Sequence, residues 1–115
     1  LVSLEDPQLA QNAALELLHQ HPDLAGIYVA GGGIEGVIDA LRDTPQPQLV
    51  TVCHDLTDIT RQALLDGSIT AVLSHPLPAM ARALCDAMQL ALESRSSPQR
   101  WQTLVPFELF TAANV

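Results

Sequence analysis

Three short apolar runs alternate with longer stretches in which apolar residues recur every three or four positions. The runs cover 24–30, 49–53 and 69–73, and each is short enough to be a buried strand. The stretches at 7–21, 34–42, 57–67 and 76–92 have helical spacing. Shorter apolar segments at 1–4 and 101–110 predict an opening and a closing strand. Strands that alternate with helices predict a three-layer α/β/α fold with a parallel sheet.

Residues typical of helix ends support these boundaries. Asp6 can cap the first helix, because Pro7 follows it at the first helical position. Thr57 can cap the third helix, and Gly67 can close it. We expect Ile59, Ala63 and Leu64 to face the core from this third helix. The fourth helix is expected to present an apolar stripe made of Met80, Ala81, Leu84, Met88, Ala91 and Leu92.

The composition indicates one globular domain that does not bind nucleic acid. Its 115 residues are 48% hydrophobic and 16% charged, with a net charge of −8. The five basic residues are scattered and form no patch for phosphates: Arg42, Arg61, Arg82, Arg95 and Arg100. No apolar run approaches the roughly 20 residues of a membrane span, and the first residues show no basic segment of a signal peptide. Cys53 and Cys85 are expected to be buried thiols in a reducing compartment.

Polar and glycine-rich loops follow three of the predicted strands, at 31–33, 53–56 and 74–76. Ligands of parallel sheets bind at the carboxyl ends of the strands, so these loops are the candidate site. Gly31, Gly33 and Gly36 match the spacing G-x-G-x-x-G, and Asp55 follows at the position of a ribose-binding carboxylate. Two interpretations remain open: a dinucleotide site, or a tight turn that needs glycine.

Other chemistry finds less support in these loops. A zinc site would need three or four ligands, and the adjacent residues Cys53, His54 and Asp55 point in different directions. Ser74, His75 and Asp55 could be drawn as a catalytic triad, but no G-x-S-x-G elbow accompanies them. We therefore expect no metal site and no catalytic triad. Asp55 could instead accept hydrogen bonds from ligand hydroxyls, or it could cap the third helix.

Four segments resemble the effector-binding domain of transcription regulators of the lactose-repressor (LacI) type. They cover 25–41, 52–57, 60–76 and 105–114, nearly the whole chain and in the same order. The resemblance implies one lobe of a periplasmic-binding-protein-like fold, whose two lobes enclose a small ligand, usually a sugar. It implies that 1–115 is most of the C-terminal lobe, without the DNA-binding headpiece and the N-terminal lobe. The expectation of no cofactor and no enzyme follows from this resemblance alone.

The resemblance also assigns residues to the ligand. Asp55 matches the family's ligand-binding Asp, and His75 stands where many members have a ligand-contacting Gln. Ala30 and Gly31 replace an Asn-Asp pair, which removes a sugar contact. The predicted ligand-binding set is therefore Asp55, His75, Gly32, Gly33, Ala30 and His54. Asp55 and His75 are expected to approach each other near Gly32 and Gly33.

The main functional hypothesis is the sugar-sensing part of a cytoplasmic LacI-type regulator. Ligand-induced lobe closure would change a homodimer, which contacts operator DNA only through the headpiece. One alternative is a periplasmic sugar-binding protein of an ABC transporter, and another is a nucleotide-dependent, Rossmann-like enzyme. Because an incomplete lobe exposes surface, we also expect an open sheet edge or apolar face that drives self-association.

Overall fold

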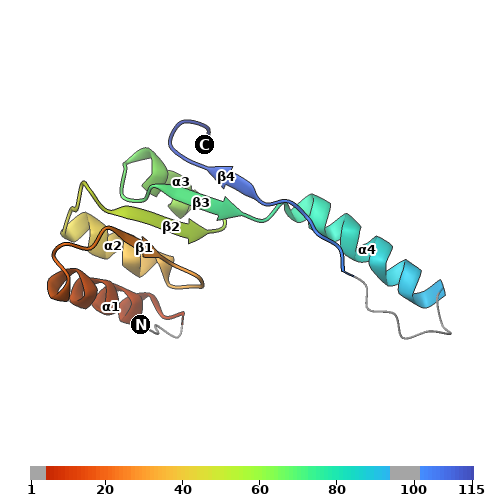
Figure 1. The fold of residues 1–115 in the computed structure, drawn as a ribbon, viewed down its shortest axis with the longest axis horizontal. Helices are drawn as coiled ribbons and strands as arrows, with labels where there is room; N and C mark the ends of the chain where they lie inside the picture. Colours follow the sequence, from red (N-terminus) through yellow and green to blue (C-terminus); the bar gives the residue numbers. More distant parts are fainter. Residues whose placement is uncertain (1–4, 94–101) are drawn as a thin grey trace. The chain divides into compact units, whose positions relative to one another are not determined.

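The computed structural model describes residues 5–93 and 102–115, which form four helices and four strands (Figure 1). The chain divides into one unit made of 1–74 and 109–115 and a second made of 75–108. In order, the elements are α1 (Pro7–Gln20), β1 (Gly26–Tyr28), α2 (Ile34–Asp43), β2 (Val50–His54), α3 (Asp58–Leu65), β3 (Ala71–Ser74), α4 (Leu77–Glu93) and β4 (Glu108–Phe110).

The strands form one sheet in the order β1-β2-β3-β4. β1, β2 and β3 are parallel, with Tyr28 beside Val52 and His54 beside Leu73. These strands confirm the predicted α/β fold. The prediction of a wholly parallel sheet is wrong at the closing strand, because β4 runs opposite to β3 (Figure 1). The sheet is therefore mixed, with its last strand antiparallel to β3 (Figure 1).

The first unit has one helical layer and one sheet layer. Right-handed crossovers through neighbouring parallel strands place α2 and α3 on the same face of the sheet. On the opposite face Tyr28 is 60% exposed and Val50 is 49% exposed. The second helical layer of the predicted three-layer arrangement is therefore not part of this unit as far as the structure describes it.

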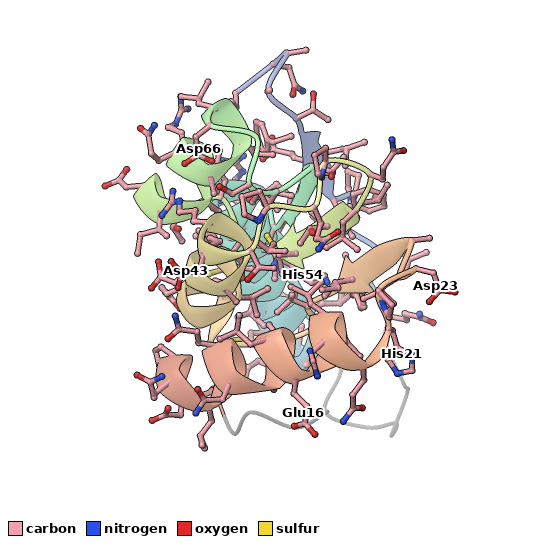
Figure 2. All side chains as sticks on the ribbon, turned by 90° about the vertical axis from the view of Figure 1, so that its left-hand side faces the viewer. Glu16, His21, Asp23, Asp43, His54 and Asp66 are labelled. Carbon is pink, nitrogen blue, oxygen red and sulfur yellow. The ribbon has the colours of Figure 1, made fainter. Side chains whose placement is uncertain are left out.

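The core lies between the helices and the sheet. Its largest fully buried apolar side chains come from both layers: Ile38, Leu64, Cys53 and Val72. Phe110 and Val115 pack against this core, which holds the closing segment in place. Charged side chains stay at the periphery, as Glu16, Asp43 and Asp66 illustrate (Figure 2).

An ion pair between Arg42 and Asp66 links the C-terminal ends of two helices in this layer. The Arg42 Nη2 atom lies 2.6 Å from Asp66 Oδ2, linking the end of α2 to the end of α3. Partial burial, the largest influence, would raise the pKa of Asp66. Hydrogen bonds from Ser68 and Arg42, with the Arg42 charge, outweigh it and hold the pKa below its usual value.

The predicted helix caps are confirmed, whereas one predicted core residue of α3 is exposed. Asp6 Oδ1 accepts a 2.9 Å hydrogen bond from Leu9 N at the start of α1. Thr57 caps α3, which buries Ala63 and Leu64 as expected. The prediction for Ile59 is wrong, because its position in the first turn leaves it 45% exposed.

The second unit departs further from the prediction. No residue of α4 is buried, so its apolar stripe is not packed in a core, and Cys85 is exposed rather than buried. The closing strand covers only Glu108–Phe110, since Pro106 interrupts the longer extended segment. The predicted strand at 1–4 and the first residue of the segment 101–110 lie outside the described residues. No helix in the part described has the length and apolarity to cross a membrane.

α1 and α2 approach each other closely at one glycine. A β-carbon added to Gly36 would lie 1.8 Å from the carbonyl oxygen of Pro7, far inside contact distance. Only hydrogen fits between the two backbones here. Gly36 is thus required for packing α2 against the start of α1, a role that differs from helix–strand packing in a dinucleotide site.

Candidate ligand-binding edge of the sheet

The first unit brings two of the three predicted loops to the carboxyl edge of its parallel strands. The segment 30–33 follows β1, and the segment 55–57 follows β2. Asp55 N donates a 2.9 Å hydrogen bond to Leu73 O, and Leu56 N donates to Ser74 Oγ at 3.4 Å. These bonds fix the β2 loop to the end of β3. The structure therefore gathers Ala30, Gly32, Gly33, His54 and Asp55 at one edge.

His75 begins the second unit, directly after β3. It is exposed, and its carbonyl oxygen accepts a 2.8 Å hydrogen bond from Leu77 N. Its approach to Asp55 remains a prediction.

Asp55 leaves the strand in an unusual backbone conformation. Its φ angle is +64°, in the left-handed region that Asp and Asn tolerate better than other residues with a β-carbon. Thr60 Oγ1 donates a 2.9 Å hydrogen bond to Asp55 O, which holds this turn against α3. The residue is exposed, so its carboxylate is accessible to a ligand. In a continued strand, Asp55 would share a face with the buried Cys53, because side chains alternate between the two faces. The left-handed turn ends this alternation, so the Asp55 side chain does not follow Cys53 into the core.

The carboxylate of Asp55 also affects the thiol before it. Burial raises the pKa of Cys53 to about 11, and the negative charge of Asp55 adds to this effect. Cys53 is fully buried, so its thiol stays protonated at neutral pH. It is a core residue and not a nucleophile.

An aromatic and imidazole pair that sequence reasoning missed lies beside this edge. Tyr28 Oη and His54 Nε2 are hydrogen-bonded at 2.5 Å, and the ring centroids are 5.5 Å apart in an edge-to-face arrangement. Tyr28 and His54 share one face of the sheet, because Tyr28 pairs with Val52 and His54 lies two residues further along β2. Pairing β1 with β2 in register would have revealed this contact. The pair fixes the His54 ring next to Asp55.

Two of the three glycines in the loop at 31–33 have a structural reason to be glycine. Gly33 adopts a φ of +83° and begins α2 without a side-chain cap. A β-carbon on Gly32 would lie 2.9 Å from the Glu5 β-carbon, whereas one on Gly31 would meet nothing closer than 3.7 Å. Of the motif's three glycines, Gly31 thus has room for a side chain. The interpretation as a tight turn accounts for this geometry better than the interpretation as a dinucleotide site.

Metal ligands do not gather at this edge. Among residues 5–93 and 102–115, no three His, Cys, Asp or Glu side chains are arranged to hold a metal ion. The chemistry available is hydrogen bonding from one carboxylate, one imidazole and the loop backbone.

Two buried threonines give a matched test of the turn that carries Asp55. Thr60 Oγ1 donates to Asp55 O and accepts a 2.8 Å hydrogen bond from Thr57 N. In the part of the chain described, the buried Thr51 Oγ1 has no hydrogen-bond partner. We expect Thr60→Val to lower the free energy of unfolding by about 1–3 kcal/mol, since it strands two backbone groups.

Thr51→Val should have the opposite sign, raising the free energy of unfolding by about 1 kcal/mol, because it removes a hydroxyl buried without a partner. Urea denaturation of both variants measures the difference. Equal effects in the same direction would contradict the assigned hydrogen bonds.

The sheet topology defines a class: an α/β lobe whose candidate ligand-binding edge lies at the carboxyl ends of its parallel strands. A sequence family described as a periplasmic binding protein domain matches residues 2–96. The chain belongs to this family. A comparison with curated proteins finds no match.

Solved structures share the fold at low sequence identity. The chain is similar to GanP, a glucose-galactose binding protein from Geobacillus stearothermophilus, with 17% identity and a TM-score of 0.82 over 98% of this chain and 40% of GanP. It is similar to AraP, an arabinose binding protein from the same organism, with 22% identity and a TM-score of 0.73 over 96% of this chain and 41% of AraP. An ABC transporter solute binding protein from Agrobacterium vitis with bound D-fucose has 21% identity and a TM-score of 0.78 over 99% of this chain and 39% of that protein. The chain therefore spans about 40% of the length of these relatives.

Proposed function

We propose that this chain is most of one lobe of a sugar-binding protein that delivers its ligand to an ABC transporter. The observation that carries this proposal is Asp55, an exposed carboxylate at the carboxyl edge of a lobe whose fold matches sugar-binding proteins. The LacI-type resemblance implied the same kind of lobe. The structures compared above are sugar-binding proteins rather than regulators, so they favour the transporter alternative over the regulator.

The chemistry of the edge fits a neutral polyol. Asp55 can accept hydrogen bonds from two neighbouring hydroxyls through its two oxygens. His54 precedes it at the end of β2, and the glycine loop at 31–33 follows the neighbouring strand β1 at the same edge of the sheet. The loops of this edge, at 30–33 and 54–57, contain no Lys or Arg. A phosphate or carboxylate ligand would lack a counter-charge from these loops, whereas a sugar needs none.

A lobe of this kind acts with a second lobe. Because the chain spans about 40% of its relatives' length, we propose that the other lobe supplies the opposite wall of the site. A sugar held between the walls would favour the closed arrangement by its additional contacts there. Closure would then be the signal that a transporter reads.

A LacI-type regulator is the second candidate function, and the cysteines favour it. Cys53 and Cys85 are both free thiols, which are more typical of the reducing cytoplasm than of an oxidising compartment. In this case the lobe would act in a cytoplasmic homodimer, with operator DNA bound by a separate headpiece. The N-terminal sequence of the whole protein distinguishes the candidates: a signal peptide supports transport, and a helix-turn-helix supports regulation.

Calorimetric titration separates both candidates from a nucleotide-dependent enzyme. We expect the whole protein to bind at least one of D-glucose, D-galactose, L-arabinose and D-fucose, and to bind neither NAD nor NADP. The physical reason is that Gly36, the third glycine of the motif, is used for the close contact with Pro7 of α1 and not for packing a helix on the sheet, as a dinucleotide site requires. Nucleotide binding at micromolar strength, about −8 kcal/mol, would overturn the assignment.

A further inference from the structure

The side chains of Tyr28 and His54 form a hydrogen-bonded pair across two neighbouring strands of the first unit. Tyr28 Oη lies 2.5 Å from His54 Nε2, and the two ring planes meet at 70°. The backbone around the pair is held as well, because Tyr28 pairs in register with Val52 and Asp55 N donates to Leu73 O at 2.9 Å. The position of His54 and the plane of its ring are therefore set by contacts within the sheet.

The direction of this hydrogen bond decides which ring nitrogen of His54 carries the proton. A neutral imidazole has one nitrogen that donates and one that accepts, so the bond made at one nitrogen selects the tautomer. A phenol keeps its hydrogen at neutral pH, and its oxygen is a weaker acceptor than an unprotonated imidazole nitrogen, because the lone pair is shared with the ring. The favoured direction is from Tyr28 Oη to His54 Nε2, which puts the proton of the neutral imidazole on Nδ1.

A sugar offers acceptor oxygens as well as hydroxyl hydrogens to a binding site. The carboxylate of Asp55 accepts from hydroxyls but gives nothing to an oxygen without a hydrogen, such as the ring oxygen of a pyranose. In the loops at 30–33 and 54–57, the side chains that can donate are His54 and Thr57. The Thr57 hydroxyl belongs to the cap of α3, where it bonds to the amide and the hydroxyl of Thr60. His54 is thus the better placed donor.

We propose that Tyr28 is a positioning residue of the sugar site, an inference that rests on the proposed function. Its hydroxyl holds neutral His54 in the tautomer with the proton on Nδ1 and fixes the plane of the ring. The Nδ1–H group has this donor character whichever group it bonds in the protein without ligand. His54 thereby contributes a donor at the edge where Asp55 contributes an acceptor, and Tyr28 acts on the ligand through His54.

Imidazole nitrogen-15 NMR spectra of the whole protein test the tautomer directly, because protonated and unprotonated ring nitrogens resonate far apart. At about pH 8, above the ordinary titration range of histidine, we expect wild-type His54 to show a protonated Nδ1 and an unprotonated Nε2. The loss of signals in His54→Ala assigns them. Tyr28→Phe removes the hydroxyl and keeps the ring, so it should give a mixture of both tautomers. A protonated Nε2 in the wild type, or an unchanged spectrum in Tyr28→Phe, overturns the proposal.

Calorimetry of the whole protein measures the consequence for the ligand. The probe is whichever of D-glucose, D-galactose, L-arabinose and D-fucose the wild type binds most tightly. We expect Tyr28→Phe to lower this affinity about 2- to 12-fold, the range for one lost hydrogen bond. In a His54→Ala background the same substitution should cause no further loss, because its effect passes through His54. Tyr28→Phe should also unfold at the wild-type urea concentration, since Tyr28 is exposed.

The outcomes separate this inference from the proposed function. Wild-type sugar binding together with an unchanged affinity in Tyr28→Phe overturns the positioning role and leaves the proposed function standing. An equal further loss in the His54→Ala background, or a lower urea midpoint that accounts for the loss, makes Tyr28 a structural residue and also overturns it. If the wild type binds none of the four sugars, the proposed function fails and this inference fails with it.

Discussion

Replacing Asp55 with Ala is expected to lower sugar affinity about 10- to 150-fold in the whole protein. The loss of a charged hydrogen-bonding partner typically costs about 1.5–3 kcal/mol, and this range converts to that change in affinity. The substitution leaves the core intact, because Asp55 is exposed. Calorimetry with the sugar that the wild type binds best measures the change.

The backbone at Asp55 provides a control for this result. With φ at +64°, Ala pays a left-handed penalty of roughly 1–2 kcal/mol that Gly avoids. Asp55→Gly should therefore lose affinity as Asp55→Ala does, while unfolding at a higher denaturant concentration than Asp55→Ala. Retained affinity in Asp55→Gly would show that the carboxylate does not contact the ligand. A loss in Asp55→Ala alone would assign the effect to the turn.

Gly36→Ala is expected to destabilise the fold by about 1–3 kcal/mol, although alanine normally favours helices. The added β-carbon would lie 1.8 Å from Pro7 O and 2.8 Å from Gln11 N, and both atoms belong to the backbone of α1. The helices must separate to admit it. Thermal unfolding should show a midpoint lower by roughly 4–10 °C.

Gly31→Ala is the matched control, since its β-carbon meets only the end of the Glu5 side chain at 3.7 Å. We expect its stability to stay within about 0.5 kcal/mol of the wild type. A stable Gly36→Ala variant would contradict the close packing of α1 on α2.

The sequence predicted the elements of the first unit because their signals are local. Asp6 and Thr57 cap helices through bonds within three residues, and the apolar runs have the length of buried strands. The direction of β4 escaped prediction because strand pairing depends on contacts distant in sequence. The exposure of Cys85 and of the apolar stripe of α4 could not be predicted for the same reason. Helical periodicity identifies an apolar face, but it does not show whether another element covers that face.

The candidate site was predictable in part. The convergence of Gly32, Gly33 and Asp55 follows from the rule that ligands bind at the carboxyl ends of parallel strands. The Tyr28–His54 hydrogen bond and the left-handed turn at Asp55 depend on strand register and on the turn held by Thr60. The hydrogen bond could be expected only once the register of β1 and β2 was known, and a single sequence does not give that register. The spacing of Gly31, Gly33 and Gly36 wrongly suggested a nucleotide site, because Gly36 is required for the contact between α1 and α2.

The most direct test of a sugar site at the carboxyl edge is an NMR titration of this chain with D-glucose, D-galactose, L-arabinose and D-fucose. NMR detects the weak binding expected of a single lobe and locates it by residue. The account predicts saturable shifts of the amides of Gly32, Gly33, His54 and Asp55, with none at the opposite end of the strands around Gln46 and Ser68. Shifts confined to Gln46 and Ser68, or no shift with any of the four sugars, would contradict it.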